Sequence, residues 1–239
     1  MVRIVNTARR YRRVSPQPGK HVLIHGDCGS FSYASGFGFL VTSPPYFHPH
    51  RASTLHGDGY VGEISTYIEV ISAQIARCAE AVKHRRVCIV KTDVWYRGAL
   101  IPISFELARA CMNRGLRLRG HWIFNRTASY TPYSPTFSNI FVFADCSLRP
   151  HCSGVLKTTE RRQPRVPSSF TPGLFAELVR CFSDCDDVLL DPFAGMGAVF
   201  HAAKATGRSS VGIESSMAQI AKACALMHRN DDFRLVKRS

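Results

Sequence analysis

The stretch Phe37-Gly38-Phe39-Leu40-Val41-Thr42-Ser43-Pro44-Pro45-Tyr46 says more about the fold than any other part of this 239-residue chain. Its apolar half predicts a buried strand over 37–41, and the hydroxyl and proline residues after it predict a turn. A second apolar run, 188–190, leads into the glycine-rich segment Asp191-Pro192-Phe193-Ala194-Gly195-Met196-Gly197. Open α/β sheets place their ligand sites at the carboxyl ends of parallel strands. Both turns are therefore candidates for one functional site.

Strands and helices alternate along the rest of the sequence, which predicts a mostly parallel sheet covered by helices. Further strands are expected over 21–25, 87–90, 121–125, 140–143 and 209–213, and helices over 61–83, 102–114, 172–182, 198–206 and 215–229. The fold class is therefore α/β, with a Rossmann-like, seven-stranded mixed sheet in a single domain over 21–239. Residues 1–20 are basic and lack periodicity, which predicts an N-terminal arm.

Composition narrows the class of partner. The chain has 31 Lys and Arg against 17 Asp and Glu, a net charge of +14 and a pI near 9.7, which favours a polyanion such as nucleic acid. Nine cysteines without a CxxC pair, no signal peptide and no apolar run of membrane-spanning length predict a cytoplasmic protein with reduced thiols, nucleoid-associated in a prokaryote. No familiar zinc spacing occurs, so we expect no metal.

The glycine-rich segment has the pattern of a Rossmann-type turn between a strand and a helix. Glu214 follows about twenty residues later, where a carboxylate suits the two hydroxyls of a ribose. Phe200 stands where the dinucleotide fingerprint has its third glycine. A ligand with a ribose but no phosphate is therefore favoured over a dinucleotide. The alternative interpretation is an ordinary glycine turn in an α/β core.

Together the two motifs resemble those of the β-class amino-methyltransferases, which carry a methyl group from S-adenosylmethionine to an exocyclic base nitrogen. The resemblance covers about residues 21–230 and has the circularly permuted order, with the TSPPY segment before the glycine turn. Serine at position 43 resembles the branch that acts on N4 of cytosine. The sequence departs from the family at Ala198-Val199, where serine or threonine is usual. The resemblance implies the S-adenosylmethionine-dependent methyltransferase fold, with that molecule as cofactor.

The resemblance also implies roles for individual residues. In catalysis, Ser43 and the Pro44 carbonyl would each accept an amino hydrogen, Pro45 would help to hold that carbonyl rigid, and Tyr46 would stack on a base swung out of the duplex. The residues implied to bind the cofactor are Asp27, Cys28, Thr42, Phe170, Thr171, Asp191, Phe193, Ala194, Gly195, Gly197 and Glu214. For Asp27 the alternative is a turn or helix-capping aspartate.

A short target-recognition region is expected over about 126–170. Its basic residues are candidates for contact with double-stranded DNA, namely Arg126, Lys157, Arg161, Arg162 and Arg165. Tyr130, Tyr133 and Phe137 interleave with this region and could stack or wedge between bases. The alternative for any one arginine is a solvated loop. Because the region is short, a homodimer is expected.

Three other functions stay open at the level of sequence. Methylation of N6 of adenine uses the same chemistry, although family members for that amine mostly have aspartate in place of Ser43. Methylation of RNA is a second alternative, and a catalytically silent nucleic-acid-binding module is a third, since fold does not settle activity. A cognate restriction endonuclease, as in restriction–modification systems, is compatible with the sequence but does not follow from it.

Overall fold

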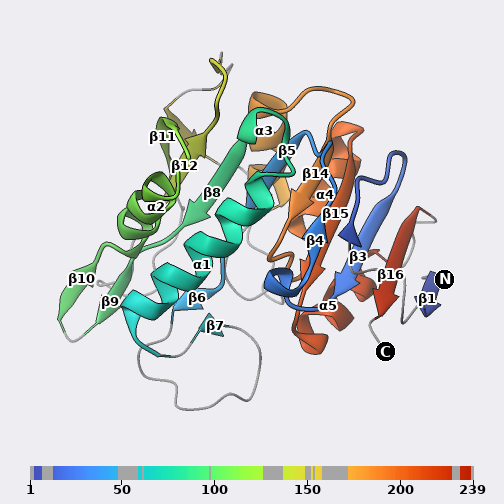
Figure 1. The fold of residues 1–239 in the computed structure, drawn as a ribbon, viewed down its shortest axis with the longest axis horizontal. Coiled ribbons are helices and arrows are strands. Elements are labelled where there is room, and N and C mark those ends of the chain that lie inside the picture. The colour runs from blue at the N-terminus through green and yellow to red at the C-terminus, as the bar shows by residue number, and fades with distance from the viewer. Residues whose placement is uncertain are drawn as a thin grey trace.

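The computed structural model describes residues 3–6, 13–47, 59–60, 62–96, 98–125, 137–148, 152, 154–157, 172–227 and 232–237. Its centre is a ten-stranded mixed sheet with the order β1-β16-β3-β15-β14-β5-β8-β12-β11-β13 (Figure 1). The strands are β1 (Arg3–Asn6), β3 (His21–His25), β5 (Phe39–Thr42), β8 (Val87–Lys91), β11 (Leu118–Asn125), β12 (Phe137–Phe143), β13 (Val155–Lys157), β14 (Val188–Asp191), β15 (Ser209–Glu214) and β16 (Phe233–Lys237). Neighbouring strands are parallel except β12, which runs antiparallel to both β8 and β11.

Three short strand pairs lie outside the sheet. β2 (Arg13–Val14) pairs with β4 (Ser32–Tyr33), β6 (Tyr46–Phe47) with β7 (Gly59–Tyr60), and β9 (Val94–Tyr96) with β10 (Ala99–Ile101). Two 3-10 turns are also present: η1 (Cys28–Ser30) follows β3, and η2 (Lys83–Arg85) precedes β8.

Helices cover both faces of the sheet because the central strands are apolar on both sides. α1 (Ile64–Ala79) and α2 (Ile103–Asn113) pack on one face, and α3 (Pro172–Phe182), α4 (Ala198–Thr206) and α5 (Met217–Met227) on the other (Figure 1). Along β5, Leu40 packs into the core beside α1 and α2, whereas Phe39 and Val41 pack into the core beside α3 and α4. This alternation is the period of two expected of a strand.

The α/β class is confirmed, and all seven predicted strands and five predicted helices are present. The sheet is larger than predicted by three strands, namely β1 and β13 at its two edges and β16 between β1 and β3. β1 lies within the segment expected to be an arm, where it pairs in register with β16. Val14, in the same segment, is fully buried.

Two element boundaries differ from the prediction for steric reasons. Strand β5 begins at Phe39 rather than at Phe37, because Phe37 bridges to Val82 and Gly38 makes room for a neighbour. A Cβ at Gly38 would lie 1.9 Å from the carboxyl carbon of Asp187. Helix α1 begins only at Ile64, after Gly62 with a φ of 145°.

Within the described residues, no helix combines the length and the apolar character that crossing a membrane requires. All nine cysteines have free thiols.

Candidate active site

Five neighbouring parallel strands end at the same edge of the sheet and bring the candidate residues together. In spatial order the strands are β3, β15, β14, β5 and β8. Their carboxyl ends lead, respectively, to Asp27, Glu214, the glycine-rich turn, the Ser43–Tyr46 segment and Lys91. The two motifs that are about 150 residues apart in sequence are therefore adjacent in space, as the sequence predicts.

A buried hydrogen bond joins the two motifs directly. The hydroxyl of Thr42 donates to Oδ1 of Asp191 at 2.6 Å, and the Phe193 amide donates to the same oxygen at 3.0 Å. Burial raises the pKa of the Asp191 carboxyl to about 7, against the effect of these two donors. Thr42 and Asp191 are both almost completely buried. Their hydrogen bond therefore links the start of the glycine-rich turn to the end of β5 inside the core.

The glycine-rich turn leaves its surface open at the first glycine and closed at the second. Gly195 has a φ of 52°, and among the described residues the nearest atom to a Cβ there would be the Phe193 carbonyl oxygen at 4.0 Å. Gly197 has a φ of 87°, and a Cβ there would lie 2.7 Å from Cδ2 of Phe200. The positive φ favours glycine at both positions. Only Gly195, however, lets another molecule approach the backbone.

Phe200 explains how the turn works without a third glycine. Its ring is fully buried beneath the turn, and its Cζ lies 2.7 Å from where a Cβ of Gly212 would be. Gly212 on β15 and Gly197 in the turn therefore make the room that the ring occupies. Close packing of helix and strand depends here on two glycines around an aromatic ring.

Glu214 is partly exposed and aligns the turn with the end of β15. Its two carboxylate oxygens accept hydrogen bonds from the amides of Gly195, at 2.8 Å, and Ser216, at 2.7 Å. The Ala194 amide donates to the Ile213 carbonyl at 2.9 Å. A carboxylate has about four acceptor positions and Glu214 is partly exposed, so its carboxylate suits hydroxyl donors from a bound molecule.

Asp27 and Cys28 lie beside Glu214 but differ in exposure. Asp27 is exposed and caps η1, accepting from the Gly29 amide at 2.8 Å and from the side-chain amide of Gln74 at 3.2 Å. This is the capping role that the sequence offers as an alternative to ligand binding. The Cys28 thiol is buried, which raises its pKa, and the backbone carbonyl of Cys28 accepts from the Tyr33 hydroxyl at 2.7 Å.

The Ser43–Tyr46 segment has two supports that sequence reasoning missed. Nζ of Lys91 donates to the carbonyl oxygens of Pro44, at 3.3 Å, and Pro45, at 2.5 Å. The Tyr67 hydroxyl, from α1, donates to the Pro45 carbonyl at 2.8 Å. Ser43 and Tyr46 are partly exposed at the same edge. The sequence feature that could have identified Lys91 is its place directly at the end of a buried, β-branched strand.

Lys91 is only 1% exposed, and no carboxylate pairs with it within the described residues. Burial lowers its pKa to about 7, and the negative charge of Asp93 partly opposes that effect. Its Nζ also lies 5.3 Å from the ring centroid of Tyr46 and 5.1 Å from that of Tyr67. The amine is therefore enclosed by two rings and two carbonyls.

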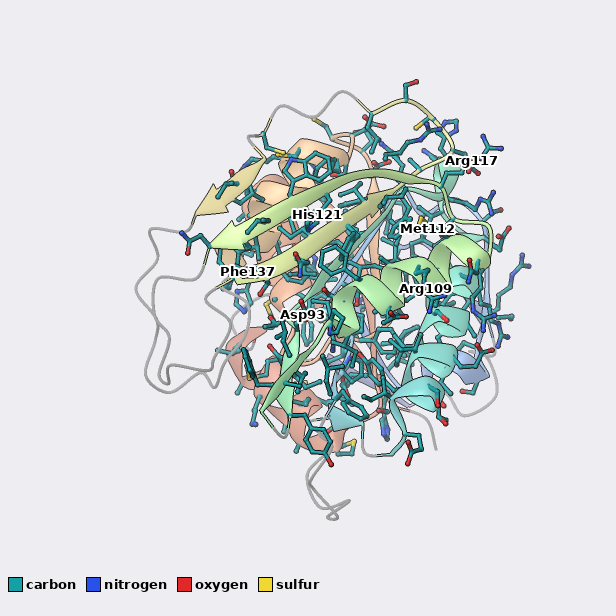
Figure 2. All side chains as sticks on the ribbon, turned by 90° about the vertical axis from the view of Figure 1, so that its left-hand side faces the viewer. Asp93, Arg109, Met112, Arg117, His121 and Phe137 are labelled. Carbon is teal, nitrogen blue, oxygen red and sulfur yellow. The ribbon has the colours of Figure 1, made fainter. Side chains whose placement is uncertain are left out.

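A buried polar network fixes the chain just after Lys91. Asp93 accepts from the Ser104 amide at 2.9 Å and from the side-chain amide of Asn139 at 3.2 Å. Asn139 also pairs with Nε2 of His121 at 2.8 Å. Figure 2 shows Asp93 beside the first turn of α2, below the strand that carries His121. The network anchors the end of β8 to α2 and β12.

Several predicted residues lie outside the described part of the chain. These are Phe170 and Thr171 of the cofactor set and Arg126, Arg161, Arg162 and Arg165 of the DNA set. Lys157 is the last residue of β13, but its side chain is not described. Phe137, an aromatic residue of the expected recognition region, is the first residue of β12. No group of three or more potential metal ligands occurs among the residues that the structure describes.

Comparison with known proteins gives one family match and many structural matches. A family model described as DNA methylase, N6_N4_Mtase, matches residues 132–224. A search of curated proteins gives no match. The fold is similar to that of TTHA0409 from Thermus thermophilus in complex with S-adenosyl-L-methionine, at 21% identity and a TM-score of 0.71, covering 92% of this chain and 99% of that one.

Two further solved structures are similar in fold. The PvuII DNA methyltransferase, described as cytosine-N4-specific, has 14% identity and a TM-score of 0.74, covering 93% of this chain and 90% of that one. M1.HpyAVI in complex with S-adenosylmethionine has 17% identity and a TM-score of 0.58, covering 85% and 98%. The sequence match and the shared fold confirm the resemblance to the β-class amino-methyltransferases that the two motifs indicate.

Proposed function

We propose that this protein is a DNA methyltransferase that transfers a methyl group from S-adenosylmethionine to N4 of cytosine. The observation that carries the proposal is the buried bond between Thr42 and Asp191, which holds the Ser43–Tyr46 segment beside the glycine turn. A methyl donor and an acceptor amine must lie within contact distance, because positioning supplies much of the rate of such a reaction. The family match to DNA methylases supports the same chemistry.

The cofactor end of the site has the groups that an adenosyl ligand requires. Gly195 exposes backbone that a Cβ would cover, and Glu214 has acceptor capacity for ribose hydroxyls. Asp27 is exposed at the end of the neighbouring strand, where its second carboxylate oxygen suits an adenine amino group. When bound, S-adenosylmethionine supplies a methyl group on a sulfonium, so transfer moves positive charge to the acceptor amine, which then releases a proton.

The acceptor end has hydrogen-bond acceptors for an amino group. Ser43 offers a hydroxyl oxygen, and the Pro44 carbonyl has one lone pair left beyond its long bond to Lys91. Together they would take the two amino hydrogens and turn the nitrogen lone pair toward the methyl group. Tyr46 offers a ring for stacking on the base, which must leave the duplex to reach this edge of the sheet.

Cytosine is the proposed base because position 43 is serine rather than aspartate. The cytosine-N4-specific description of the structurally similar PvuII enzyme supports that choice. The charge of +14 supports a DNA partner, and the short recognition region motivates a homodimer. Light scattering tests the homodimer against a monomer of 26.6 kDa.

Transfer of labelled methyl groups tests the proposed activity. The protein is incubated with methyl-labelled S-adenosylmethionine and either unmodified genomic duplex DNA or total RNA. We expect label in DNA and a background level in RNA, with Ser43→Ala as the matched inactive variant. Label in RNA alone would assign the activity to RNA, and no label in either despite cofactor binding would indicate the silent module.

A further inference from the structure

Lys91 has contacts that suit the acceptor segment rather than the stability of the fold. Its Nζ contacts the carbonyls of two consecutive prolines, Pro44 and Pro45, which have no N–H groups of their own. Burying an amine away from water is costly, and no carboxylate within the described residues compensates it through an ion pair. A buried amine that carries this cost without a paired carboxylate is a candidate for a functional role.

We propose that Lys91 is a positioning residue for methyl transfer, which fixes the direction of the Pro44 and Pro45 carbonyls beside the acceptor amine. The inference rests on the proposed function and adds to it a residue outside the TSPPY segment. Tyr67 shares the task at Pro45 through its hydroxyl. The Pro44 carbonyl, which is proposed to hold the amine, accepts its side-chain hydrogen bond from Lys91.

The charge of Lys91 matters because the acceptor amine becomes positive during transfer. An ammonium that donates to the Pro44 carbonyl draws electron density from that oxygen and places positive charge close to the reacting nitrogen. A neutral amine still has two N–H donors for the two carbonyls, without that repulsion. The pKa of about 7 makes the neutral form accessible near neutral pH. Activity is therefore expected to rise as the pH increases through about 7.

The groups that face Lys91 define what else contributes to this titration. They are Asp93 on the segment after β8, Tyr46 from the TSPPY segment and Tyr67 from α1. Burial raises the pKa of Tyr67, so its hydroxyl stays protonated. Asp191, on β14, also has a pKa of about 7, so a pH profile of activity needs a variant that removes only the lysine.

The test compares Lys91→Met with Lys83→Met. Methionine keeps the length of the side chain and removes its donors, and Lys83 is an exposed lysine in η2, before the opposite end of β8. For Lys91→Met we expect kcat to fall at least about tenfold, as for the loss of an orienting hydrogen bond, with the dissociation constant for S-adenosylmethionine within about twofold. The rise of kcat through pH 7 should disappear in this variant and persist in Lys83→Met.

Thermal unfolding of the ligand-free proteins supplies a readout that does not depend on activity. The unfolded chain has a lysine of ordinary pKa near 10.4, whereas the folded chain has one near 7. Between those values the unfolded state binds more protons, so wild-type stability rises with pH relative to Lys91→Met. The Tm of the variant minus that of wild type should therefore decrease as the pH rises from 7 to 10. A difference that is constant with pH would show that Lys91 is charged in the folded protein.

A second variant keeps the proposal testable if Lys91→Met does not fold. Tyr67→Phe removes one donor to Pro45 and keeps the ring, so kcat should fall about two- to fivefold relative to wild type, as for one weakened hydrogen bond. In that case the side-chain NMR signal of Lys91 in the wild type should titrate near pH 7, and a midpoint above 9 would overturn the inference.

Wild-type protein that transfers no methyl group would defeat the proposed function alone. Full kcat in Lys91→Met, with wild-type transfer intact, would defeat only the role of Lys91.

Discussion

The cofactor end and the acceptor end of the site are built in different ways. At the cofactor end, the Glu214 carboxylate accepts from the backbone amides of Gly195 in the turn and of Ser216 just after β15, so the supports come from one strand–turn–helix–strand segment of the chain. At the acceptor end, the Ser43–Tyr46 segment is supported by side chains from β8 and α1, Lys91 and Tyr67. The first can be recognised from a motif, whereas the second depends on distant parts of the chain.

This difference predicts that the two ends fail separately. A change at the acceptor end should reduce turnover and leave cofactor affinity unchanged. A change at Glu214 should reduce cofactor affinity and leave turnover at saturating cofactor unchanged. The Thr42–Asp191 bond joins the two ends through their side chains, so both ends depend on it.

Ser43→Ala should separate the two ends most strongly. Removing one group that stabilises a transition state typically costs about 10²–10³ in kcat, so turnover should fall by about that factor. Because Ser43 lies on the side of the turn away from Glu214, the calorimetric affinity for S-adenosylmethionine should stay within about twofold. Near-normal turnover would remove Ser43 from the acceptor site.

Glu214→Ala should weaken the cofactor end. We expect the affinity for S-adenosylmethionine to fall by about 1–3 kcal/mol, the cost of losing charge-assisted hydrogen bonds. Glu214→Gln is the matched control, because it keeps one acceptor oxygen and should lose less. Equal calorimetric affinity for all three proteins would mean that Glu214 serves only the backbone amides of Gly195 and Ser216.

The two glycines of the turn should respond differently to alanine. Both substitutions cost about 1–2 kcal/mol because of the positive φ, and Gly197→Ala adds about 1–3 kcal/mol for overlap with Phe200. Gly195→Ala has no such overlap, so its free energy of unfolding should fall less than that of Gly197→Ala. It covers the open backbone of the turn, however, so it should weaken cofactor binding more than Gly197→Ala does. Denaturant unfolding and calorimetry on both variants measure the two effects, and equal destabilisation would contradict the packing described around Phe200.

The basic residues between β1 and β2 should influence the reaction least. Replacing Arg9, Arg10 and Arg12 with glutamine should make the salt dependence of DNA binding shallower, by about 0.9 in log–log slope for each phosphate that the protein no longer touches. Turnover with saturating DNA should not change. Binding measured between about 50 and 200 mM salt tests this, and an unaltered slope would show that these residues do not touch the phosphates.

Sequence patterns were sufficient for the parts of the fold that follow local rules. The apolar runs of β5 and β14 and the turn glycines Gly195 and Gly197 identify buried strands and the ligand edge without knowledge of contacts. The edge strands β1 and β13 and the inner strand β16 were missed because their short runs carry charged residues and lack a clear period.

The supports of the site could not be derived in the same way. Thr42 and Asp191 are predicted from the motifs to contact the cofactor, whereas the hydrogen bond between their side chains, 149 positions apart in sequence, follows from no local pattern. Asp27 caps η1, a role that no pattern separates from ligand binding. Lys91 and Tyr67 reach the proline carbonyls only because β8 and α1 pack beside β5, which is a consequence of topology rather than of spacing.

The proposal that this edge of the sheet methylates N4 of cytosine is best tested by identifying the modified nucleoside. Unmodified duplex DNA is incubated with the protein and S-adenosylmethionine, digested to nucleosides and separated by chromatography with mass detection. We predict N4-methyldeoxycytidine as the product, absent when Ser43→Ala replaces the wild type. N6-methyldeoxyadenosine as the product would contradict the assignment of Ser43 to a cytosine amine.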